Sequence, residues 1–317
     1  IVEILKPYSN CRVYDPCCGS GGMFVQSVKF LKEHSGNRYS ISVYGQESNA
    51  DTWKMAKMNM AIRGIGVDFG SYHADTFFND LHPALKADFI MANPPFNLSN
   101  WGQEKLKDDV RWKYGIPPAG NANYAWIQHM IYHLAPNGKI GLVLANGALS
   151  TQTSGEGEIR KKIIEDDLVE GIVAMPTQLF YSVTIPVTLW FISKNKKQKG
   201  KTLFIDARKM GYMVDRNHRD FTDEDIQKLG KAFEDFQNGK AEDVKGFCAV
   251  ASTEDIAKQD YILTPGRYVG IEEQEDDGEP FDDKMKRLTS ELSELFAKSH
   301  ELEAEIRKNL GVIGYEM

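Results

Sequence analysis

The tetrapeptide Asn93-Pro94-Pro95-Phe96 carries the residues best suited to chemistry in this chain. A residue before proline is disfavoured in the helical region, so Asn93 and Pro94 are both expected to be extended. The Asn93 amide oxygen and the Pro94 carbonyl would then offer two hydrogen-bond acceptors beside the aromatic face of Phe96. Two acceptors and a ring suit an exocyclic amino group on a planar heterocycle, such as N6 of adenine. A plain proline-rich turn fits these four residues equally well, so the motif needs support from the rest of the chain.

A strand and a glycine-rich loop lie upstream of this motif. Residues 87–92, directly before it, are apolar and typical of a buried parallel strand. Residues 12–31 predict a short strand ending at Asp15, a turn with four glycines or serines, and a helix. This order is the front of a Rossmann-type unit, in which glycines let the backbone approach a ligand. The spacing is that of neither a dinucleotide fingerprint nor a phosphate loop, and Asp15 suits a ligand with a cationic or hydroxyl-bearing group.

Acidic residues also end the next two predicted strands. Glu47 follows a strand at 41–46, where an acid can accept hydrogen bonds from ribose hydroxyls. Asp75 follows a third strand near 66–72. Each acid alone could be a solvated loop carboxylate. Three at successive strand ends indicate one ligand site, because ligands of open α/β sheets bind outside the carboxyl ends of the strands.

Together these motifs resemble the S-adenosylmethionine-dependent N6-adenine DNA methyltransferases. Within that group the chain is most similar to the methylation (M) subunits of type I restriction–modification systems. The similarity continues through residues 138–144, 179–181 and 264–269 and into the charged C-terminal helix, so it covers nearly the whole chain. The resemblance implies an α/β fold: a doubly wound, Rossmann-like class I methyltransferase sheet with an antiparallel last strand, plus a C-terminal helical tail.

The resemblance also implies three groups of site residues. The catalytic group is Asn93, Pro94, Pro95 and Phe96. The group that would bind S-adenosylmethionine is Asp15, Pro16, Gly19, Ser20, Gly21, Gly22, Glu47, Ser48, Asp75 and Thr76. Phe96, with Phe180 and Tyr181 as weaker candidates, would stack on an adenine flipped out of the duplex. The methyl group already sits on a sulfonium leaving group, so no metal and no covalent enzyme intermediate is expected.

The chain is expected to divide into three parts. Residues 1–200 would form the catalytic domain, 201–275 its C-terminal extension, and 276–317 a linker followed by a heptad helix. Further elements are predicted as helices at 121–134 and 222–237, and as strands at 140–145, 169–175 and 187–193, one of the last two antiparallel. Residues 98–118 combine tryptophan with lysine and arginine, which fits a mobile DNA-facing or lid loop as well as an ordinary solvated one.

Charge points to a partner. The chain has a formal net charge of -7, although an enzyme acting on DNA is expected to carry a basic footprint. Residues 271–317 hold 14 acidic and 6 basic residues, leaving 31 acidic and 32 basic residues in 1–270. The catalytic body is therefore nearly neutral. Sequence recognition, and much of the affinity for double-stranded DNA, is expected to come from another polypeptide.

The C-terminal helix is the candidate docking element. Its apolar residues follow a 3-4 spacing interrupted only by Ser299: Met285, Leu288, Leu292, Leu295, Leu302 and Ile306. Such a helix can pack on its own chain, but the resemblance favours docking of 282–317 on a specificity (S) subunit. A second M subunit and a restriction (R) subunit would complete the complex. Gly311 is predicted to end the helix.

Composition restricts the compartment. No apolar stretch long enough to span a membrane and no signal peptide occurs, and the four cysteines lack the spacing of a zinc site. Buried thiols in a reducing cytoplasm are the expectation. The chain starts at Ile1, and the family's helical N-terminal domain and its cofactor-contacting segment, similar to Gly-Glu-Phe-Tyr-Thr, are not in the sequence. On that basis the natural amino terminus is expected to be missing, and cofactor binding to be weak.

Two alternative functions stay open from the sequence. A methyltransferase acting on another planar amide, such as a protein glutamine, uses a similar site, but that family typically has Tyr where this chain has Phe96 and lacks the long tail. A noncatalytic scaffold that binds the cofactor is the other, and the intact tetrapeptide argues against it. A dehydrogenase is disfavoured because the dinucleotide fingerprint is absent.

Overall fold

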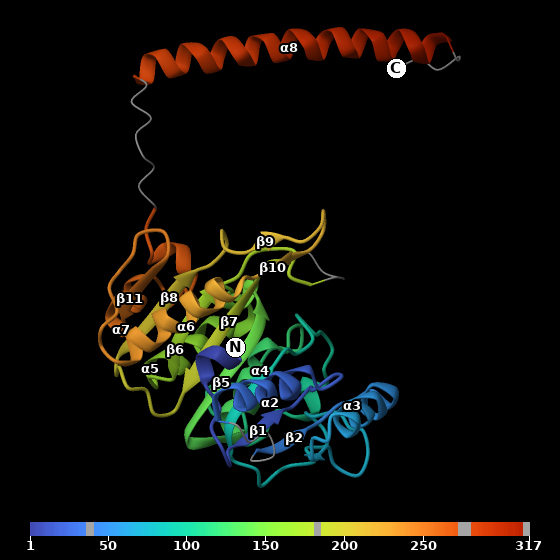
Figure 1. Ribbon diagram of the computed structural model, residues 1–317, viewed down its shortest axis with the longest axis vertical. Coiled ribbons are helices and arrows are strands. Elements are labelled where there is room, and N and C mark those ends of the chain that lie inside the picture. The colour runs from blue at the N-terminus through green and yellow to red at the C-terminus, as the bar shows by residue number, and fades with distance from the viewer. Residues whose placement is uncertain (36–40, 181–184, 272–279, 313–317) are drawn as a thin grey trace. The chain divides into compact units, whose positions relative to one another are not determined.

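A computed structural model describes residues 1–35, 41–180, 185–271 and 280–312 (Figure 1). It divides into two compact units, Ile1–Glu272 and Glu273–Met317. The α-helices are α1 (Val2–Leu5), α2 (Gly22–Ser35), α3 (Ala50–Ile62), α4 (Asn123–His133), α5 (Glu156–Glu165), α6 (Asp223–Gln237), α7 (Thr253–Lys258) and α8 (Phe281–Val312). The strands are β1 (Arg12–Asp15), β2 (Ser42–Gly45), β3 (Val67–Asp68), β4 (Ala87–Ala92), β5 (Leu134–Ala145), β6 (Val169–Ala174), β7 (Val187–Ser193), β8 (Lys201–Asp206), β9 (Tyr212–Met213), β10 (Arg219–Asp220) and β11 (Cys248–Ser252). Short 3-10 turns cover Gln103–Lys105, Asn146–Leu149, Thr153–Gly155 and Pro265–Arg267.

The first unit is built on one nine-stranded sheet in the order β11-β8-β6-β7-β5-β4-β1-β2-β3. Strands β1 to β5 are mutually parallel, and β7 runs antiparallel between β5 and β6. The predicted α/β sheet with an antiparallel strand is therefore confirmed. Two later strands extend this sheet beyond β6: β8 pairs parallel with β6, and β11 pairs antiparallel with β8. Strands β9 and β10 form a separate antiparallel pair.

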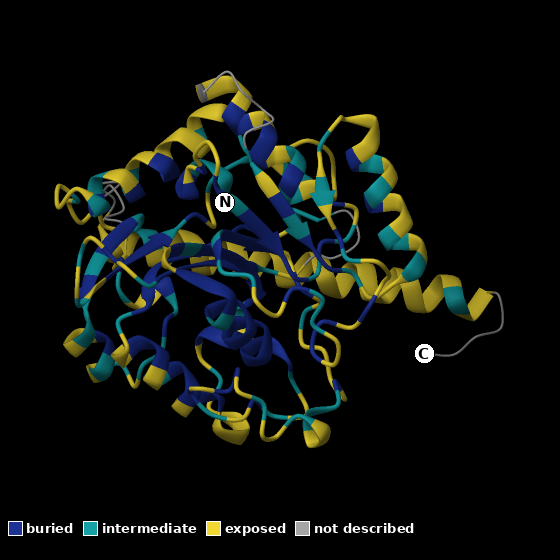
Figure 2. Cartoon of the chain, turned by 90° about the horizontal axis from the view of Figure 1, so that it is seen from below, coloured by how far each residue is buried: buried dark blue, intermediate teal, exposed yellow. Residues whose placement is uncertain are grey.

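Helices cover both faces of this sheet, as the apolar side chains on both faces of β4 require. Its successive side chains point to opposite faces: Ile90 joins the core under α4 and α5, while Phe89 and Met91 join the core under α1, α2, α3 and α6. Both faces are buried, which explains why β4 is apolar except for Asp88, which is partly exposed and paired with Arg12. Figure 2 shows the strands as a largely buried layer, with the exposed residues on the helices and the loops.

Local signals set several of the boundaries. The α6 helix begins after Thr222, whose hydroxyl accepts from Asp225 N while the Asp225 carboxylate accepts from Thr222 N, a capping box. The third strand, expected near 66–72, is reduced to Val67–Asp68. Gly70 follows with φ of +68°, a left-handed conformation that does not continue a strand. The loop after it therefore starts early and carries Asp75.

The aromatic residues of 98–118 differ from both sequence interpretations. Trp101, Trp112 and Tyr114 are buried in the core beneath α4, and the Arg111 side chain is only 6% exposed. The three aromatic residues are therefore structural and do not offer an aromatic surface to DNA. Sequence composition did not show this because the contacts are made with residues far away along the chain. A role of the exposed Lys105 and Lys107 at DNA stays a prediction.

The second unit is described by its helix α8. Its 32 residues include no buried side chain, and the predicted apolar residues of the 3-4 pattern are each about half exposed. Gly311 lies inside the helix, one residue before its end, so the prediction that it terminates the helix is wrong. Most of the expected linker, 276–279, lies outside the described residues.

None of the helices described in this structure is long and apolar enough to cross a membrane.

Candidate functional site

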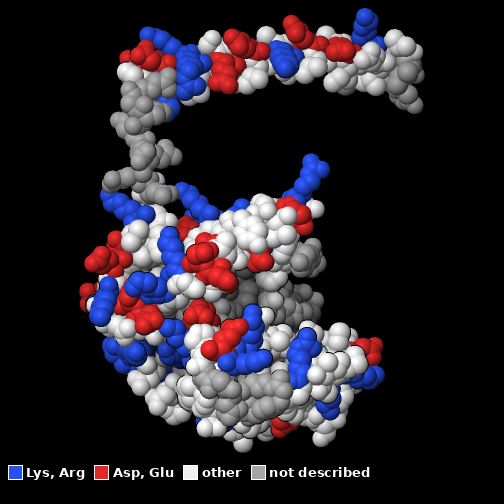
Figure 3. Space-filling view, viewed as in Figure 1, with Lys and Arg blue, Asp and Glu red and all other residues white. Residues whose placement is uncertain are grey.

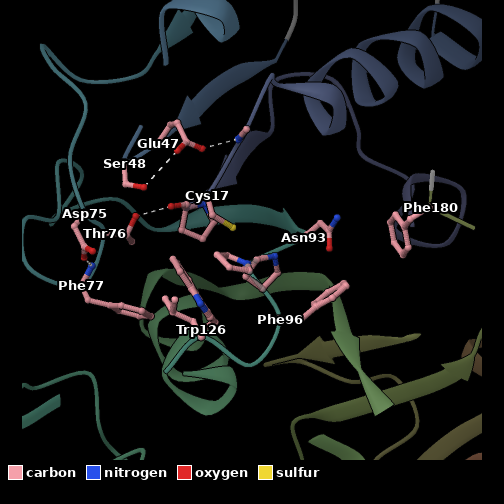
Figure 4. Close-up of a pocket in the computed structure, with 15 residues that line it drawn as sticks. Cys17, Glu47, Ser48, Asp75, Thr76, Phe77, Asn93, Phe96, Trp126 and Phe180 are labelled. Atoms are coloured by element: carbon pink, nitrogen blue, oxygen red, sulfur yellow. Dashed lines mark hydrogen bonds between the residues drawn. The ribbon is translucent and has the colours of Figure 1, made fainter. Parts of the chain in front are cut away.

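A cavity of about 450 Å³ lies at the carboxyl ends of the parallel strands (Figure 4). That volume is within the range of small-molecule sites. The loops after β1, β2, β3 and β4 supply most of its wall, and α4 and the loop after β6 supply one aromatic residue each. The lining residues are Pro16, Cys17, Gly19, Glu47, Ser48, Asp75, Thr76, Phe77, Asn93, Pro94, Pro95, Phe96, Leu98, Trp126 and Phe180.

The loop after β1 is held in shape by its neighbours. Cys18 N donates to Gln46 O at 2.9 Å, and Thr76 Oγ1 donates to Pro16 O at 2.5 Å. Gly19 has φ of +53°, and a Cβ built on it would meet no atom within 4 Å. The backbone at Gly19 is thus exposed to the cavity, as a loop that a ligand must approach closely requires.

Glu47 joins the first two loops. Its Oε2 accepts from Gly19 N at 3.1 Å, and its Oε1 accepts from Asn49 N at 2.8 Å. Ser48 Oγ also donates to Oε1 at 3.4 Å. Because each carboxylate oxygen has about two lone-pair sites, Oε2 keeps capacity for a ligand hydroxyl. The side chain of Gln46 is fully buried behind it and bonds Ala74 O and Asn79 O, which fastens the segment that carries Asp75.

Asp75, Thr76 and Phe77 form the next part of the wall. Asp75 Oδ1 accepts from Phe77 N at 2.8 Å and from Phe78 N at 3.2 Å. Phe77 is buried and packs 4.3 Å, centroid to centroid, from the Trp126 ring. This end of the cavity therefore presents an apolar aromatic surface beside a carboxylate.

Asp15 lies beneath the loop and does not line the cavity. It is 3% exposed, and its Oδ1 accepts from Cys17 N at 3.0 Å. Burial raises the pKa of Asp15 to about 7, an effect opposed by the Cys17 N–H and reinforced by the nearby charge of Glu47. A positive charge in the cavity would stabilise the ionised form.

The Asn93–Phe96 tetrapeptide occupies the other end of the cavity. Asn93 and Pro95 are exposed, Pro94 is buried, and Phe96 is partly buried. Within the described part of the chain, the Asn93 side chain and the Pro94 carbonyl make no hydrogen bond to protein. The rings of Phe96 and Phe180 lie 6.1 Å apart at 69°. Two free acceptors and two rings therefore stand at one place.

A pair of asparagines fixes the chain just after this tetrapeptide. Asn97 N donates to Asn123 Oδ1 at 3.2 Å, and Asn123 Nδ2 donates back to Asn97 Oδ1 at 3.0 Å. Asn123 is fully buried at the start of α4, and Asn97 adopts φ of 53°. Both side-chain amides are used for positioning, in contrast to that of Asn93.

The charge of the cavity favours a cationic ligand. Among the described residues that line it, Glu47 and Asp75 are the charged ones, and both are acidic. Lysine and arginine lie elsewhere on the first unit, interspersed with acids on the face that Figure 3 shows. An anionic group such as a pyrophosphate would find no complementary charge here.

Comparison with known proteins identifies the family. The family model described as N-6 DNA Methylase matches residues 1–277. The HindI type I restriction enzyme methylase subunit of Haemophilus influenzae is 60% identical over 317 residues, covering 100% of this chain and 71% of that protein. The MjaIX methylase subunit of Methanocaldococcus jannaschii is 45% identical and covers 99% of this chain and 58% of its own length. The chain belongs to the N-6 DNA methylase family.

Solved structures agree with this assignment. A type I restriction–modification methyltransferase subunit from Streptococcus thermophilus superposes with a TM-score of 0.75 at 29% identity, covering 84% of this chain and 56% of that one. The EcoKI M protein, at 19% identity and a TM-score of 0.66, shares the fold over 99% of this chain. The resemblance to N6-adenine DNA methyltransferases of type I systems is thus confirmed, and the glutamine-methyltransferase alternative has no support in these relatives.

The structure brings most of the predicted site residues together. Those that line one cavity are Pro16, Gly19, Glu47, Ser48, Asp75, Thr76, Asn93, Pro94, Pro95, Phe96 and Phe180. Asp15, Ser20, Gly21 and Gly22 are absent from its lining: Asp15 lies below the loop, and Gly21, with φ of +82°, packs on Met60. Tyr181 lies outside the described residues.

Four lining residues were not predicted as site residues: Cys17, Phe77, Leu98 and Trp126. Cys17 and Phe77 directly adjoin predicted residues, so the strand-end rule would have included them. Leu98 follows the tetrapeptide by two positions. Trp126 had no signal, because in sequence it is one apolar position of an amphipathic helix.

Proposed function

We propose that this chain transfers the methyl group of S-adenosylmethionine to N6 of a flipped adenine in double-stranded DNA, as the modification subunit of a type I restriction–modification complex. The observation that carries the proposal is the division of one cavity. Acids and an aromatic wall occupy one end. The other end holds the acceptors of Asn93 and Pro94, which make no hydrogen bond to any residue that the structure describes.

The cofactor end fits S-adenosylmethionine. The molecule would supply a methyl group bonded to a positively charged sulfonium, which matches the acidic lining by Glu47 and Asp75. Glu47 would accept hydrogen bonds from the ribose hydroxyls of the cofactor, and Phe77 and Trp126 would pack on the cofactor's own adenine ring. The exposed backbone at Gly19 would allow close approach. Asp15, Ser20, Gly21 and Gly22 would act by shaping the loop.

The base end fits an amino group that must become a better nucleophile. The N6 lone pair of adenine is delocalised into its ring. Asn93 Oδ1 and the Pro94 carbonyl would accept hydrogen bonds from the two N6 hydrogens and stabilise the positive charge that N6 gains as the new N–C bond forms and the C–S bond of the sulfonium breaks. One N6 proton is then lost to solvent. Holding nitrogen and methyl group in line removes much of the entropic barrier. Pro95 would keep Pro94 extended, so that its carbonyl faces the base.

The aromatic residues would hold the flipped base. Adenine inside a duplex cannot reach this cavity, so it must leave the stack. Phe96 offers one face, and Phe180, whose ring lies nearly perpendicular to it, closes the same end of the cavity.

Product analysis tests this proposal. The chain would be combined with its specificity subunit, plasmid DNA and tritiated S-adenosylmethionine, and the digested nucleosides would be separated. We expect label in N6-methyladenine, and its loss in Asn93→Ala. Asn238→Ala is the matched control, because Asn238 is an exposed asparagine at the end of α6, away from the cavity. Label on cytosine or on protein, or full activity of Asn93→Ala, would refute the proposal.

We propose further that α8 docks on helices of the specificity subunit. Its half-exposed apolar residues lie on one side of the helix, with Leu288, Leu292 and Leu295 at the centre. The near-neutral charge of residues 1–270 agrees with DNA recognition by a partner. Association with a second M subunit and a restriction subunit, and a cytoplasmic location, belong to the same proposal.

Co-purification tests the docking role. Leu292→Asp combined with Leu295→Asp should abolish capture of the specificity subunit. Phe296→Asp is the matched control, because Phe296 is 59% exposed but lies outside the 3-4 pattern. Equal loss with Phe296→Asp, or normal capture by the double variant, would show that the pattern does not form the interface.

A further inference from the structure

Arg111 stands out among the buried charged residues because it touches the back of the cavity wall and not the cavity. Its side chain is 6% exposed, and it comes from the 98–118 segment. Nη1 donates to Thr76 O at 3.1 Å, and Nη2 donates to Phe77 O. Thr76 and Phe77 both line the cavity. A single guanidinium thus holds two consecutive carbonyls of the cofactor wall.

All five N–H donors of this guanidinium are used. Nε and Nη2 donate to the two Asp109 carboxylate oxygens at 2.8 and 2.6 Å, and Nη1 donates to His129 Nδ1 at 3.0 Å. Buried charge is tolerated when it is paired and fully hydrogen-bonded. A lysine, with three donors on one nitrogen, cannot reproduce this planar fork.

The histidine side of the contact extends the network to β1. Arginine only donates, so His129 Nδ1 accepts, and the proton lies on Nε2, which donates to Tyr14 Oη at 3.1 Å. Burial and the nearby His133 and Arg111 hold the pKa of His129 well below its usual range, so the ring is neutral. Arg111 therefore links the cofactor wall to α4 and to the strand that ends at Asp15.

The same contact argues against a metal at this place. Asp80, His129 and His133 have potential ligand atoms within 4.8 Å of one another. His129 Nδ1 is already bonded to a cation, and His133 Nε2 is paired with Asp80 Oδ2 at 2.8 Å. These groups are better explained as support for Arg111 and for the base of α4.

We infer that Arg111 is a positioning residue for cofactor binding. By holding the carbonyls of Thr76 and Phe77, it fixes the wall against which the cofactor packs, and it couples that wall to the 98–118 segment. The inference rests on the proposed use of S-adenosylmethionine. Arg111 does not itself line the cavity and makes no described contact with Asn93–Phe96, so its removal should weaken cofactor binding and spare the chemical step.

The chain offers a matched control. Arg208 follows Asp206 as Arg111 follows Asp109, and its Nε and Nη2 bind Asp206 oxygens at 2.8 and 2.5 Å. The Arg208 side chain is 58% exposed and makes no described contact with the cavity wall. Comparing identical substitutions at the two arginines therefore separates the effect of losing the contact with the cavity wall from the effect of losing a local arginine–aspartate pair.

Calorimetric titration of S-adenosylmethionine into the full chain is the first test. We expect Arg111→Lys to raise Kd about 10-fold and Arg111→Met to raise it more, because hydrogen bonds from charged groups are about twice as strong as neutral ones. Arg208→Lys and Arg208→Met should stay within about twofold. At saturating cofactor, methyl transfer by the complex should fall less than about threefold in Arg111→Lys. Unchanged Kd in folded Arg111 variants, even with a lowered Tm, would overturn the inference.

Hydrogen exchange provides a second test that does not need cofactor. Phe77 N donates to Asp75 Oδ1, so exchange of the 75–79 amides reports the order of the wall. Faster exchange there in Arg111→Lys, but not in Arg208→Lys, supports the positioning role; equal exchange refutes it. If Arg111→Met does not fold, the same exchange and calorimetric measurements on Arg111→Lys and Asp109→Asn test the inference. Failure of the wild-type chain to bind S-adenosylmethionine would instead refute the proposed function.

Discussion

The two ends of the cavity differ in how far their polar groups are already satisfied by the protein. At the cofactor end, Glu47 and Thr76 make hydrogen bonds to backbone groups of the loop after β1, and Asp75 accepts from amides of its own loop. At the base end, the side chain of Asn93 makes none within the described chain, although Asn97 and Asn123 next to it are reciprocally bonded. The cofactor end is therefore preorganised by hydrogen bonds within the protein, whereas the acceptors of the base end remain available to the substrate.

This difference assigns the ends to different steps. A wall held by its own hydrogen bonds suits binding, because little has to be ordered when the ligand arrives. Free acceptors aimed at a reacting nitrogen suit catalysis, because their bonds strengthen as charge develops. Substitutions at the two ends should therefore separate into effects on cofactor affinity and effects on the rate of transfer.

Asn93→Ala should give the largest effect. Removing an acceptor that acts on developing charge costs about 10²- to 10³-fold in rate in comparable sites. We expect kcat to fall by that order while Kd for S-adenosylmethionine changes less than about twofold. Single-turnover assays in the complex, with calorimetry on the same variant, provide the measurement. A large loss of cofactor affinity would mean that the two ends are not independent.

Glu47→Gln should give the opposite result. The carboxylate holds Gly19 N and offers acceptors to the cofactor, and hydrogen bonds to a charged group contribute about 1.5–3 kcal/mol. Kd for S-adenosylmethionine should rise about 10- to 100-fold, with kcat at saturating cofactor close to that of the wild type. Glu254→Gln is the control, because Glu254 is exposed in the first turn of α7 and does not line the cavity. A fall in kcat without a change in Kd would contradict the comparison.

The contrast also explains what the sequence could reveal. Asp15, Glu47, Asp75 and Asn93 were predicted to meet, because parallel strands place their carboxyl ends on one edge and each residue ends a recognisable apolar segment. The family resemblance implied an antiparallel strand, but its position between β5 and β6 was not predicted, because periodicity does not show which strands pair.

The parts that were missed depend on contacts between distant residues. Trp126 reaches the cavity from α4, and Arg111 turns inward because Thr76, Phe77 and His129 offer acceptors there. In sequence, Arg111 is one basic residue in a segment that also contains exposed lysines. Its burial could be predicted only with knowledge of which loop packs beneath α4.

Phe96→Ala should lower kcat/KM for DNA about 10- to 30-fold, since stacking on an aromatic side chain contributes about 1–3 kcal/mol per base. Phe180→Ala should have a smaller effect in the same direction, because the Phe180 ring lies edge-on to Phe96 and does not extend its stacking face. Neither should alter cofactor affinity. Fluorescence of 2-aminopurine at the target position reports flipping directly. Normal base flipping in Phe96→Ala would show that Phe96 does not stack on the flipped adenine.

The pH dependence of cofactor binding should give the smallest effect, and it probes the coupling of the buried Asp15 to the cofactor end. Its pKa is raised to about 7 by burial, so in the unliganded protein the carboxyl is largely protonated below that pH. A cationic ligand favours the ionised form, so binding should release a proton below pH 7 and none well above it.

Glu47, Cys17 and Cys18 are the other titratable groups around Asp15, and burial raises the pKa of both thiols, so neither ionises in this range. Kd should therefore fall up to about tenfold from pH 6 to pH 8 and then level off, whereas Asp15→Asn should give a flat profile. Calorimetry in buffers of different ionisation enthalpy measures the proton release. A wild-type profile as flat as that of Asp15→Asn would show that Asp15 shapes the loop and that its ionisation does not depend on the ligand's charge.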